Sequence, residues 1–294
     1  MAFEVIIIGG SYAGLSSALT LARARRRVLV IDEGIRRNRF ARHSHGFLTE
    51  DGTPPEEIAA KAKAQILRYP TVTCLDARAD SAAGITDQFR VTAGEQEHQA
   101  RRLILATGVV DMLPKIDGVA ERWGDSIFHC PYCHGYELDL GRIGVVATSP
   151  IAMHQAMMLP DWGETTLLLN DAFEPDAEQR AALAQRGTAV EAGAITGLSG
   201  RADVRLADGR LLPFDGLFVA PFPRLASDFA EQLGCAIDDT PFGQSIRTDG
   251  MKATTVAGVF AAGDAARAAG NVTFAVADGS MAALAAHRSL MGLH

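Results

Sequence analysis

The stretch VIIIGGSYAGLSSALTLARARRRVLVID, residues 5–32, decides the fold of this chain. It indicates an apolar strand, a glycine-rich turn, a segment with apolar residues at helical spacing, and a second apolar strand, which together are typical of a βαβ unit. Gly9, Ser11 and Gly14 hold the three positions of G-x-G-x-x-G, and Asp32 ends the second strand about 20 residues further on, where such units place an acid for a ribose. We therefore predict a dinucleotide-binding domain here.

The residues of this turn have separate physical roles. Gly9 permits the tight turn, the middle position lets a diphosphate approach the backbone, and Gly14 lets helix and strand pack closely. Ser11 replaces glycine at the middle position, and because its side chain is small we expect a slightly displaced diphosphate rather than a lost site. Gly10 and Glu33 adjoin these positions and belong to the same candidate cofactor site.

Composition limits the class of protein. The chain has 294 residues, 48% hydrophobic and 21% charged, which is a globular balance and enough for two ordinary domains. A formal net charge of −7 argues against nucleic acid as a partner, since phosphate binding draws on clustered Lys and Arg. The basic run at 36–39 fits a solvated loop or a local phosphate contact. We see no signal-peptide pattern and no long apolar run, so we expect a cytoplasmic protein without a membrane span.

HCPYCHGYE, residues 129–137, is the second distinctive stretch. Its two cysteines, Cys130 and Cys133, are compatible with a zinc site, a covalent haem attachment (C-x-x-C-H), a redox disulfide or a solvated turn. Zinc would need two further ligands, which the adjoining histidines could supply, whereas Cys74 and Cys235 are isolated in the sequence. In a cytoplasmic protein such a pair is more often catalytic or metal-binding than structural.

Two later strands extend the pattern. RRLILATG (101–108) indicates a strand ending in a small-residue turn, and TTVAGVFAAGDAA (254–266) indicates another. The order of these motifs resembles the pyridine nucleotide-disulfide oxidoreductases, which are flavoproteins. The resemblance implies FAD as cofactor and an α/β fold with two Rossmann-like dinucleotide-binding domains of three layers, the second inserted into the first. It also implies cofactor contacts from Thr107, Gly108, Gly263, Asp264, Asn271, Val272 and Thr273, with a helix N-terminus aimed at the flavin.

The position of C-x-x-C in the middle of the chain narrows the resemblance to the low-molecular-weight thioredoxin reductases. This implies a discontinuous FAD-binding domain, residues 1–112 plus 246–294, and an inserted NAD(P)-domain-like unit, residues 113–245, with crossings near Gly118 and Gln244. It also implies a homodimer and a redox pair without a metal.

The same resemblance assigns roles around the pair. It implies that Cys130 exchanges with the substrate and that Cys133 faces the flavin. His134 stands where those reductases carry an Asp, and it could shuttle protons near neutral pH or simply pack over a loop. Glu137 could orient that histidine or be solvated.

The inserted unit departs from the reductase pattern. Its expected nucleotide turn, GRIGVVATSPIAMHQAMM, has Ala147, Ser149 and Ala152 at the three key positions, so side chains crowd the place where a diphosphate meets backbone. Ser149 and Pro150 suit the first positions of a helix. One strand later come Asn170, Asp171, Glu174 and Asp176, which would repel a 2′-phosphate. We therefore predict that NADP(H) is not a tight partner; the alternative is a divergent site that works through backbone contacts alone.

Two further patterns resemble a narrower group. C-x-x-C-H-G-(Y/W)-E, together with Arg37-Asn38 and the H-x-H-x-x-L segment that contains His45, is similar to the thioredoxin-reductase-like dithiol oxidases that close the disulfides of gliotoxin, holomycin and romidepsin. The resemblance implies that a small-molecule dithiol reduces the cysteine pair, that the pair reduces FAD, and that O2 accepts the electrons as hydrogen peroxide. Arg37, Asn38 and His45 would lie near the flavin, His45 as a flavin or substrate contact or a loop histidine with no role.

Three functions follow from these patterns. The first is an FAD-dependent dithiol oxidase acting on a small dithiol. The second is a thioredoxin reductase-like enzyme that reduces a protein disulfide with NADPH or another donor. The third, from a different class, is a non-catalytic flavin-bound redox sensor.

Overall fold

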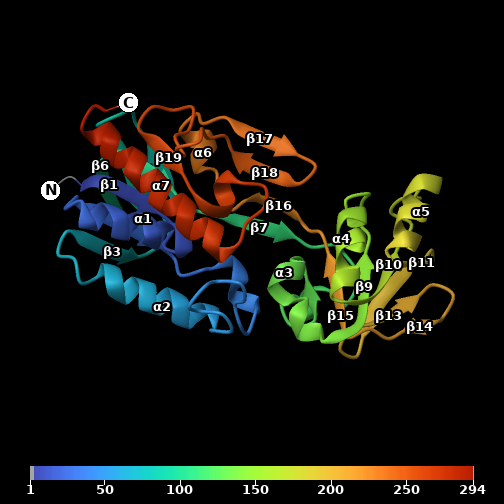
Figure 1. Cartoon of the computed structure of the whole chain (residues 1–294). Helices are drawn as coiled ribbons and strands as arrows, with labels where there is room; N and C mark the ends of the chain where they lie inside the picture. The colour runs from blue at the N-terminus through green and yellow to red at the C-terminus, as the bar shows by residue number, and fades with distance from the viewer. Residues whose placement is uncertain (1–2, 294) are drawn as a thin grey trace.

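The computed structural model describes residues 3–293 of the chain. Two groups of elements are each built on a largely parallel sheet, and helices cover one face of each sheet (Figure 1). This architecture confirms the predicted α/β class with two Rossmann-like, three-layer units.

The first sheet has seven strands in the order β3-β2-β1-β6-β5-β4, and β19 pairs with β6 beside this path. The strands β1, β2, β3, β6 and β19 are parallel, whereas β4 and β5 are antiparallel to their neighbours. Their bounds are β1 (Phe3–Ile8), β2 (Val28–Asp32), β3 (Val72–Asp76), β4 (Ser81–Ala83), β5 (Phe89–Ala93), β6 (Gln96–Leu105) and β19 (Val259–Ala261).

Alternating side chains of β1 reach two separate cores. Val5 and Ile7 pack under the helices, while Ile6 and Ile8 belong to a core on the opposite face that also includes residues of β4 and β5, and all four are at most 3% exposed. Burying such a side chain stabilises the fold by about 1.5–3 kcal/mol. The first helix and the last, from opposite ends of the chain, pack side by side on the sheet (Figure 1). The helices are α1 (Tyr12–Arg23), α2 (Pro55–Ile66) and α7 (Val272–Leu290).

The second sheet has five parallel strands in the order β11-β10-β9-β15-β8. One face packs against two helices and the other against a three-stranded meander. The strands are β8 (Ile127–Phe128), β9 (Leu140–Val146), β10 (Gly163–Leu168), β11 (Ala189–Glu191) and β15 (Gly216–Val219); the helices are α4 (Ala152–Met158) and α5 (Ala177–Gln185); the meander is β12 (Ile195–Ser199), β13 (Asp203–Leu206) and β14 (Leu211–Leu212).

Shorter elements join the two groups. Antiparallel β7 and β16 lie where the chain passes between the sheets, and β17 and β18 form a hairpin beside the first sheet (Figure 1). Their bounds, with the short helices, are β7 (Val109–Met112), β16 (Phe222–Leu225), β17 (Ile237–Thr240), β18 (Gly243–Ile246), α3 (Pro131–His134), α6 (Phe229–Gln232), η1 (Arg37–Phe40), η2 (Ala120–Arg122), η3 (Tyr136–Leu138), η4 (Leu159–Asp161) and η5 (Gly263–Ala266). None of the helices within 3–293 combines the length and apolar character needed to cross a bilayer.

Two predicted elements differ in extent. The strand expected within 254–266 is only Val259–Ala261, because the residues before it form bends and isolated bridges. The helix expected to begin near Ser149 begins at Ala152, because Ser149 and Pro150 accept i+3 amides in a turn instead of starting the α-helical ladder.

Candidate active site

The turn between β1 and α1 opens onto a large cavity. Gly9 has φ +102°, and a Cβ there would collide with the carbonyl oxygen of Ala106. A Cβ on Gly14 would collide with the Gly9 carbonyl oxygen in the same way. Gly10 donates its N–H to Asp32 Oδ1 at 2.9 Å. Only glycine fits at these positions, which leaves the start of α1 open to an approaching diphosphate.

The cavity has a volume of about 760 Å³ and is lined from both sheets. That volume lies within the usual range for small-molecule and cofactor sites, which is roughly 300–1,000 Å³. The predicted cofactor residues on its wall are Gly9, Gly10, Ser11, Asp32, Glu33, Arg37, Asn38, His45, Thr107, Gly108, Gly263, Asp264, Asn271 and Val272. Two predicted residues do not line the cavity: Gly14 supports the turn, and the exposed Thr273 donates through Oγ1 to the carbonyl of Gly46 at 3.3 Å.

Arg37 ties three segments together at the centre of the cavity wall. It donates to both carboxylate oxygens of Asp111, at 2.9 and 2.6 Å, and to Asp264 Oδ2 at 2.8 Å. Burial alone would disfavour its charge, but the two carboxylates raise the pKa of Arg37 above its ordinary value. The guanidinium therefore stays charged and fixes η1 against β7 and η5. Sequence reasoning did not find Asp111, which has no motif around it.

The residues of this cavity fit FAD. The glycine turn and the N-terminus of α1 offer backbone amides and a positive dipole end to a diphosphate. Arg36 lines the same wall, and its buried Nε finds no hydrogen-bond partner among residues 3–293, so it is a donor that a phosphate or ribose oxygen could use. Asn271 caps α7, whose first turn faces the cavity and would place its positive end near the cofactor.

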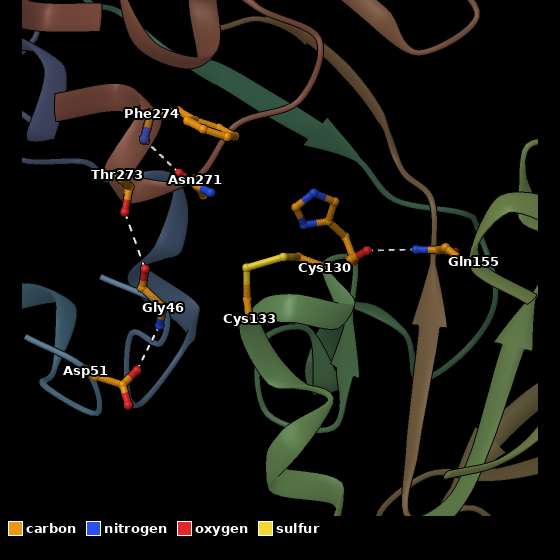
Figure 2. Close-up of a disulfide and its surroundings, with 9 residues drawn as sticks. Gly46, Asp51, Cys130, Cys133, Gln155, Asn271, Thr273 and Phe274 are labelled. Carbon is orange, nitrogen blue, oxygen red and sulfur yellow. Dashed lines mark hydrogen bonds between the residues drawn. A yellow bond between two sulfur atoms is a disulfide. The ribbon is translucent and has the colours of Figure 1, made fainter. Parts of the chain in front are cut away.

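The two cysteines form a disulfide on the opposite wall. Cys130 and Cys133 have Cα atoms 5.3 Å apart, and Cys130 is the N-cap residue of the single-turn helix α3. Figure 2 shows the disulfide facing the first turn of α7, where Asn271 accepts the N–H of Phe274 at 2.7 Å. Both cysteines line the same cavity as the glycine turn. The structure thus brings the predicted redox pair and the predicted cofactor residues into one site.

Two histidines adjoin the disulfide in a poorly solvated place. Burial lowers the pKa of His129 and of His134 to about 4; Arg37 adds to the effect on His129, and His45 adds to the effect on His134. His134 also stacks on Phe128, with ring centroids 4.4 Å apart and 20° between the ring planes. His134 is therefore neutral at pH 7 and a weak base. Of the two roles that the sequence left open for it, this environment favours packing over a proton shuttle.

Glu137, for which the sequence left open an orienting role on His134 or a solvated position, is exposed, and the structure also brings it to another histidine. It is on η3, on the wall of a smaller adjacent cavity of about 220 Å³, and its Oε1 lies 3.4 Å from His45 Nδ1. Asp51 Oδ1 lies 3.6 Å from the same nitrogen. Asp51 also accepts the N–H of Gly46 at 2.8 Å, so the loop that carries His45 is held on two sides. Both His45 and His134 line the two cavities, which places them at the junction.

Three residues that support the disulfide were not predicted. Gln155, on α4, donates to the carbonyl oxygen of His129 at 2.7 Å (Figure 2). Tyr132, between the two cysteines, is 73% exposed and packs edge-on against Trp162, with ring centroids 5.2 Å apart. Gln155 lies in α4, the helix that follows the second turn. The one sequence signal for it was a polar residue on the face of this helix that was expected to be buried.

The turn after β9 lacks the glycines of the turn after β1. Ala147 is fully buried, and its carbonyl oxygen meets Asn170 Nδ2 at 3.5 Å. Asn170 Oδ1 also accepts the N–H of Ile195 at 2.9 Å, so this side chain bridges the turn and β12. Thr148 stands where the first turn has Gly10, and Ser149 stands where it has Ser11. The residues here do not form a diphosphate cradle like the one at Gly9.

The acidic residues after β10 have mixed roles. Asp176 caps α5 by accepting the N–H of Gln179 at 2.8 Å, and Glu174 pairs with Arg180. Only Asn170 and Asp171 extend from the turn itself, both with left-handed backbone at φ +51° and +53°. The predicted repulsion of a 2′-phosphate therefore rests on fewer charges than the sequence alone indicated.

Comparisons with known proteins agree on the kind of chain. A family model described as pyridine nucleotide-disulphide oxidoreductase matches residues 3–286. Thioredoxin reductase tcpT from Claviceps purpurea is 33% identical over 98% of this chain and 94% of its own. The crystal structure of an oxidoreductase from Agrobacterium tumefaciens superposes with a TM-score of 0.98 at 56% identity, covering all of both chains. The crystal structure of HlmI superposes with a TM-score of 0.91 at 34% identity, covering 99% of this chain and 93% of that one.

Proposed function

The chain belongs to the pyridine nucleotide-disulphide oxidoreductase family, as an FAD-dependent, thioredoxin reductase-like disulfide oxidoreductase, and from this premise we propose that it oxidises a small-molecule dithiol to a disulfide with O2 as the final acceptor. Electrons then flow from the dithiol to the Cys130–Cys133 disulfide and onward to the cofactor, opposite to the direction in a thioredoxin reductase.

One observation carries this proposal. The cavity with the glycine turn also contains the disulfide, whereas the second turn, where a pyridine nucleotide would deliver electrons, has Ala147 and Thr148 in place of two glycines and is bridged by the amide of Asn170. An enzyme of this family that lacks a nucleotide donor needs another source of electrons. A dithiol that reaches the disulfide supplies them.

The chemistry follows from disulfide exchange. A substrate thiolate attacks Cys130 Sγ; an S–S bond forms to the substrate, the Cys130–Cys133 bond breaks, and Cys133 leaves as a thiolate. The second substrate thiolate then attacks the substrate sulfur in this mixed disulfide, which closes the product disulfide and releases Cys130. FAD, when bound in the cavity, supplies a two-electron acceptor that returns the pair to a disulfide and passes the electrons to O2 as hydrogen peroxide. The protein holds the pair at the cavity wall through α3 and Gln155.

An anaerobic titration of the purified yellow protein tests the direction of electron flow. NADPH is added to one sample and dithiothreitol to another while flavin absorbance is followed, and air is then admitted. We expect dithiothreitol to bleach the flavin and NADPH to bleach it at least about a hundredfold more slowly. Air should then restore the colour, with hydrogen peroxide appearing.

The names of the relatives favour a second candidate, a disulfide reductase that takes electrons from NADPH. Rapid bleaching by NADPH would replace the oxidase proposal with this reductase. Bleaching by dithiothreitol without recovery in air would leave the exchange chemistry intact but rule out O2 as the acceptor.

A further inference from the structure

His134 is the histidine nearest the cysteines in sequence, but its position does not suit proton transfer from a thiol. Its ring is stacked on Phe128, and burial lowers its pKa to about 4. A free thiol has a pKa of about 8.5, so a proton passed to such a ring is strongly disfavoured. If a side chain accepts the proton that the substrate loses, it is therefore a group other than His134.

His45 has the arrangement that His134 lacks. Its Nδ1 faces two carboxylates, Glu137 at 3.4 Å and Asp51 at 3.6 Å, and its ring lies on the wall of the cavity that holds the disulfide. Carboxylates at one ring nitrogen orient the imidazole and stabilise the positive charge it gains when the other nitrogen takes a proton. The ring centroid of His45 is 6.5 Å from that of His134, the residue after Cys133.

We propose that His45 is the proton acceptor for the dithiol half-reaction and that Glu137 is its positioning residue. The inference rests on the proposed function. As the substrate S–H approaches the disulfide, its proton moves to His45 Nε2, and the sulfur, with the electron pair of the former S–H bond, attacks Cys130 Sγ. That pair forms the new S–S bond between the substrate and Cys130, while the Cys130–Cys133 bond breaks and Cys133 leaves as a thiolate with the electron pair of the broken bond. The disulfide is the oxidant, so the step balances without another reactant.

This pair is assembled from distant parts of the chain. His45 lies in the loop between η1 and α2, whereas Glu137 follows α3 and the disulfide. The other titratable or charged groups around His45 are Asp51 on its own loop, His43, His134 after the cysteines, and Arg42, Asp125 and Arg201 on the smaller cavity. Arg42 and Asp125 pair with each other at 2.9 Å, whereas Glu137 and Asp51 each have an oxygen within 4 Å of His45 Nδ1.

The test is a pH series on the holoenzyme under anaerobic conditions. The second-order rate constant for flavin bleaching by dithiothreitol is measured from pH 6 to 10, at concentrations where the rate is proportional to dithiol. The variants are His45→Gln and Glu137→Gln, and His43→Gln is the matched control, because it removes a histidine of the same loop 6.4 Å from His45. At low dithiothreitol concentration, the measured second-order rate constant includes the disulfide-exchange step.

We expect His45→Gln to be about a hundredfold slower than the native enzyme at pH 6.5, and Glu137→Gln about tenfold slower. Both variants should approach the native rate constant near pH 10, where the dithiol ionises in water without a protein base. His43→Gln should follow the native profile throughout. A supporting role in the loop would slow the reaction equally at every pH.

The outcomes separate this inference from the proposed function. A deficit in His45→Gln that is independent of pH, or no deficit, overturns the assignment of the proton acceptor even if air restores the flavin colour. If air does not restore the colour, the oxidase proposal is overturned, but the anaerobic rate constants of the variants can still be compared with that of the native enzyme. If dithiothreitol does not bleach the native enzyme at any pH, both are overturned.

Discussion

His134 couples the stability of the fold to pH. An unfolded histidine has its ordinary pKa of 6.5, whereas burial holds the pKa of His134 at about 4 in the folded chain. Between these values the unfolded chain binds a proton that the folded chain excludes, so stability falls as pH drops from about 6.5 to about 4 and then levels off. His134→Phe keeps a ring against Phe128 without this titration. We expect it to reduce the loss of unfolding free energy between pH 7 and 5 by on the order of 1 kcal/mol.

Urea unfolding of the flavin-loaded protein at pH 7 and at pH 5 measures this loss of unfolding free energy. His154→Phe is the control, because His154 is exposed on α4 and should retain the native pH dependence. An equal loss of stability in His134→Phe and the native protein would show that the ring of His134 is solvated in solution.

For single residues, the sequence predicts which ones belong to the site better than it predicts which side chains they contact. The glycines at 9, 10 and 14 and the cysteine pair were found because each motif is local and its physics requires that residue. The partner of Glu137 was not, since His45 lies 92 positions earlier (137 − 45) and reaches Glu137 only when the two sheets come together. Asp111 and Gln155 were missed for the same reason: single polar residues carry no pattern until a partner is known.

The turn after β9 is held closed by one side chain. Asn170 joins the Ala147 carbonyl and the Ile195 N–H, and its own backbone is left-handed at φ +51°. Asn170→Gly keeps that backbone conformation without strain but removes both hydrogen bonds. We expect it to lower the free energy of unfolding by about 1–2 kcal/mol, because the partly buried N–H of Ile195 loses its acceptor.

The matched change is Asn170→Asp, which still accepts from Ile195. In chemical denaturation, Asn170→Asp should lose less than about half of the unfolding free energy that Asn170→Gly loses. If Asn170→Gly is as stable as the native protein, the side chain does not close this turn.

Element boundaries were less predictable than element types. The strand expected in 254–266 shortens to three residues, and α4 begins at Ala152, because hydrogen-bonding partners rather than local propensity decide where a strand or helix ends. The βαβ unit at the N-terminus was predicted closely, since its apolar period, its turn and its acid all agree.

The two groups of elements meet at a contact that leaves no room for a side chain. Gly124 has φ +82°, and a Cβ there would lie 2.6 Å from the Cβ of Phe40 and 2.8 Å from its carbonyl oxygen. The nearby Arg42–Asp125 pair is largely exposed and contributes less than about 1 kcal/mol, so close packing rather than charge sets the spacing. We expect Gly124→Ala to slow flavin bleaching by dithiothreitol at least about tenfold, since small displacements of reacting groups are costly.

Gly187→Ala is the control that separates the effect of the spacing at Phe40 from the effect of backbone strain at a glycine with positive φ. Gly187 has φ +76°, and no atom of the described chain lies within 4 Å of the Cβ position there. It should lose stability to a similar extent as Gly124→Ala, with a native bleaching rate in stopped-flow measurements. Equal rates for the two variants would argue that the contact at Phe40 does not position the disulfide.

The arrangement of the first sheet also has a consequence for how the chain is made. β6 is complete at Leu105, but β19, which pairs with it, begins at Val259, and α7, which covers α1, comes later still. A ribosome adding about 5–20 residues per second leaves the edge of β6 and the face of α1 uncovered for on the order of 10 s, while the second sheet can already form. The nascent chain therefore exposes a strand edge of the type that invites aggregation, and the yield of protein in a cell depends on how that edge is protected until the last helix emerges.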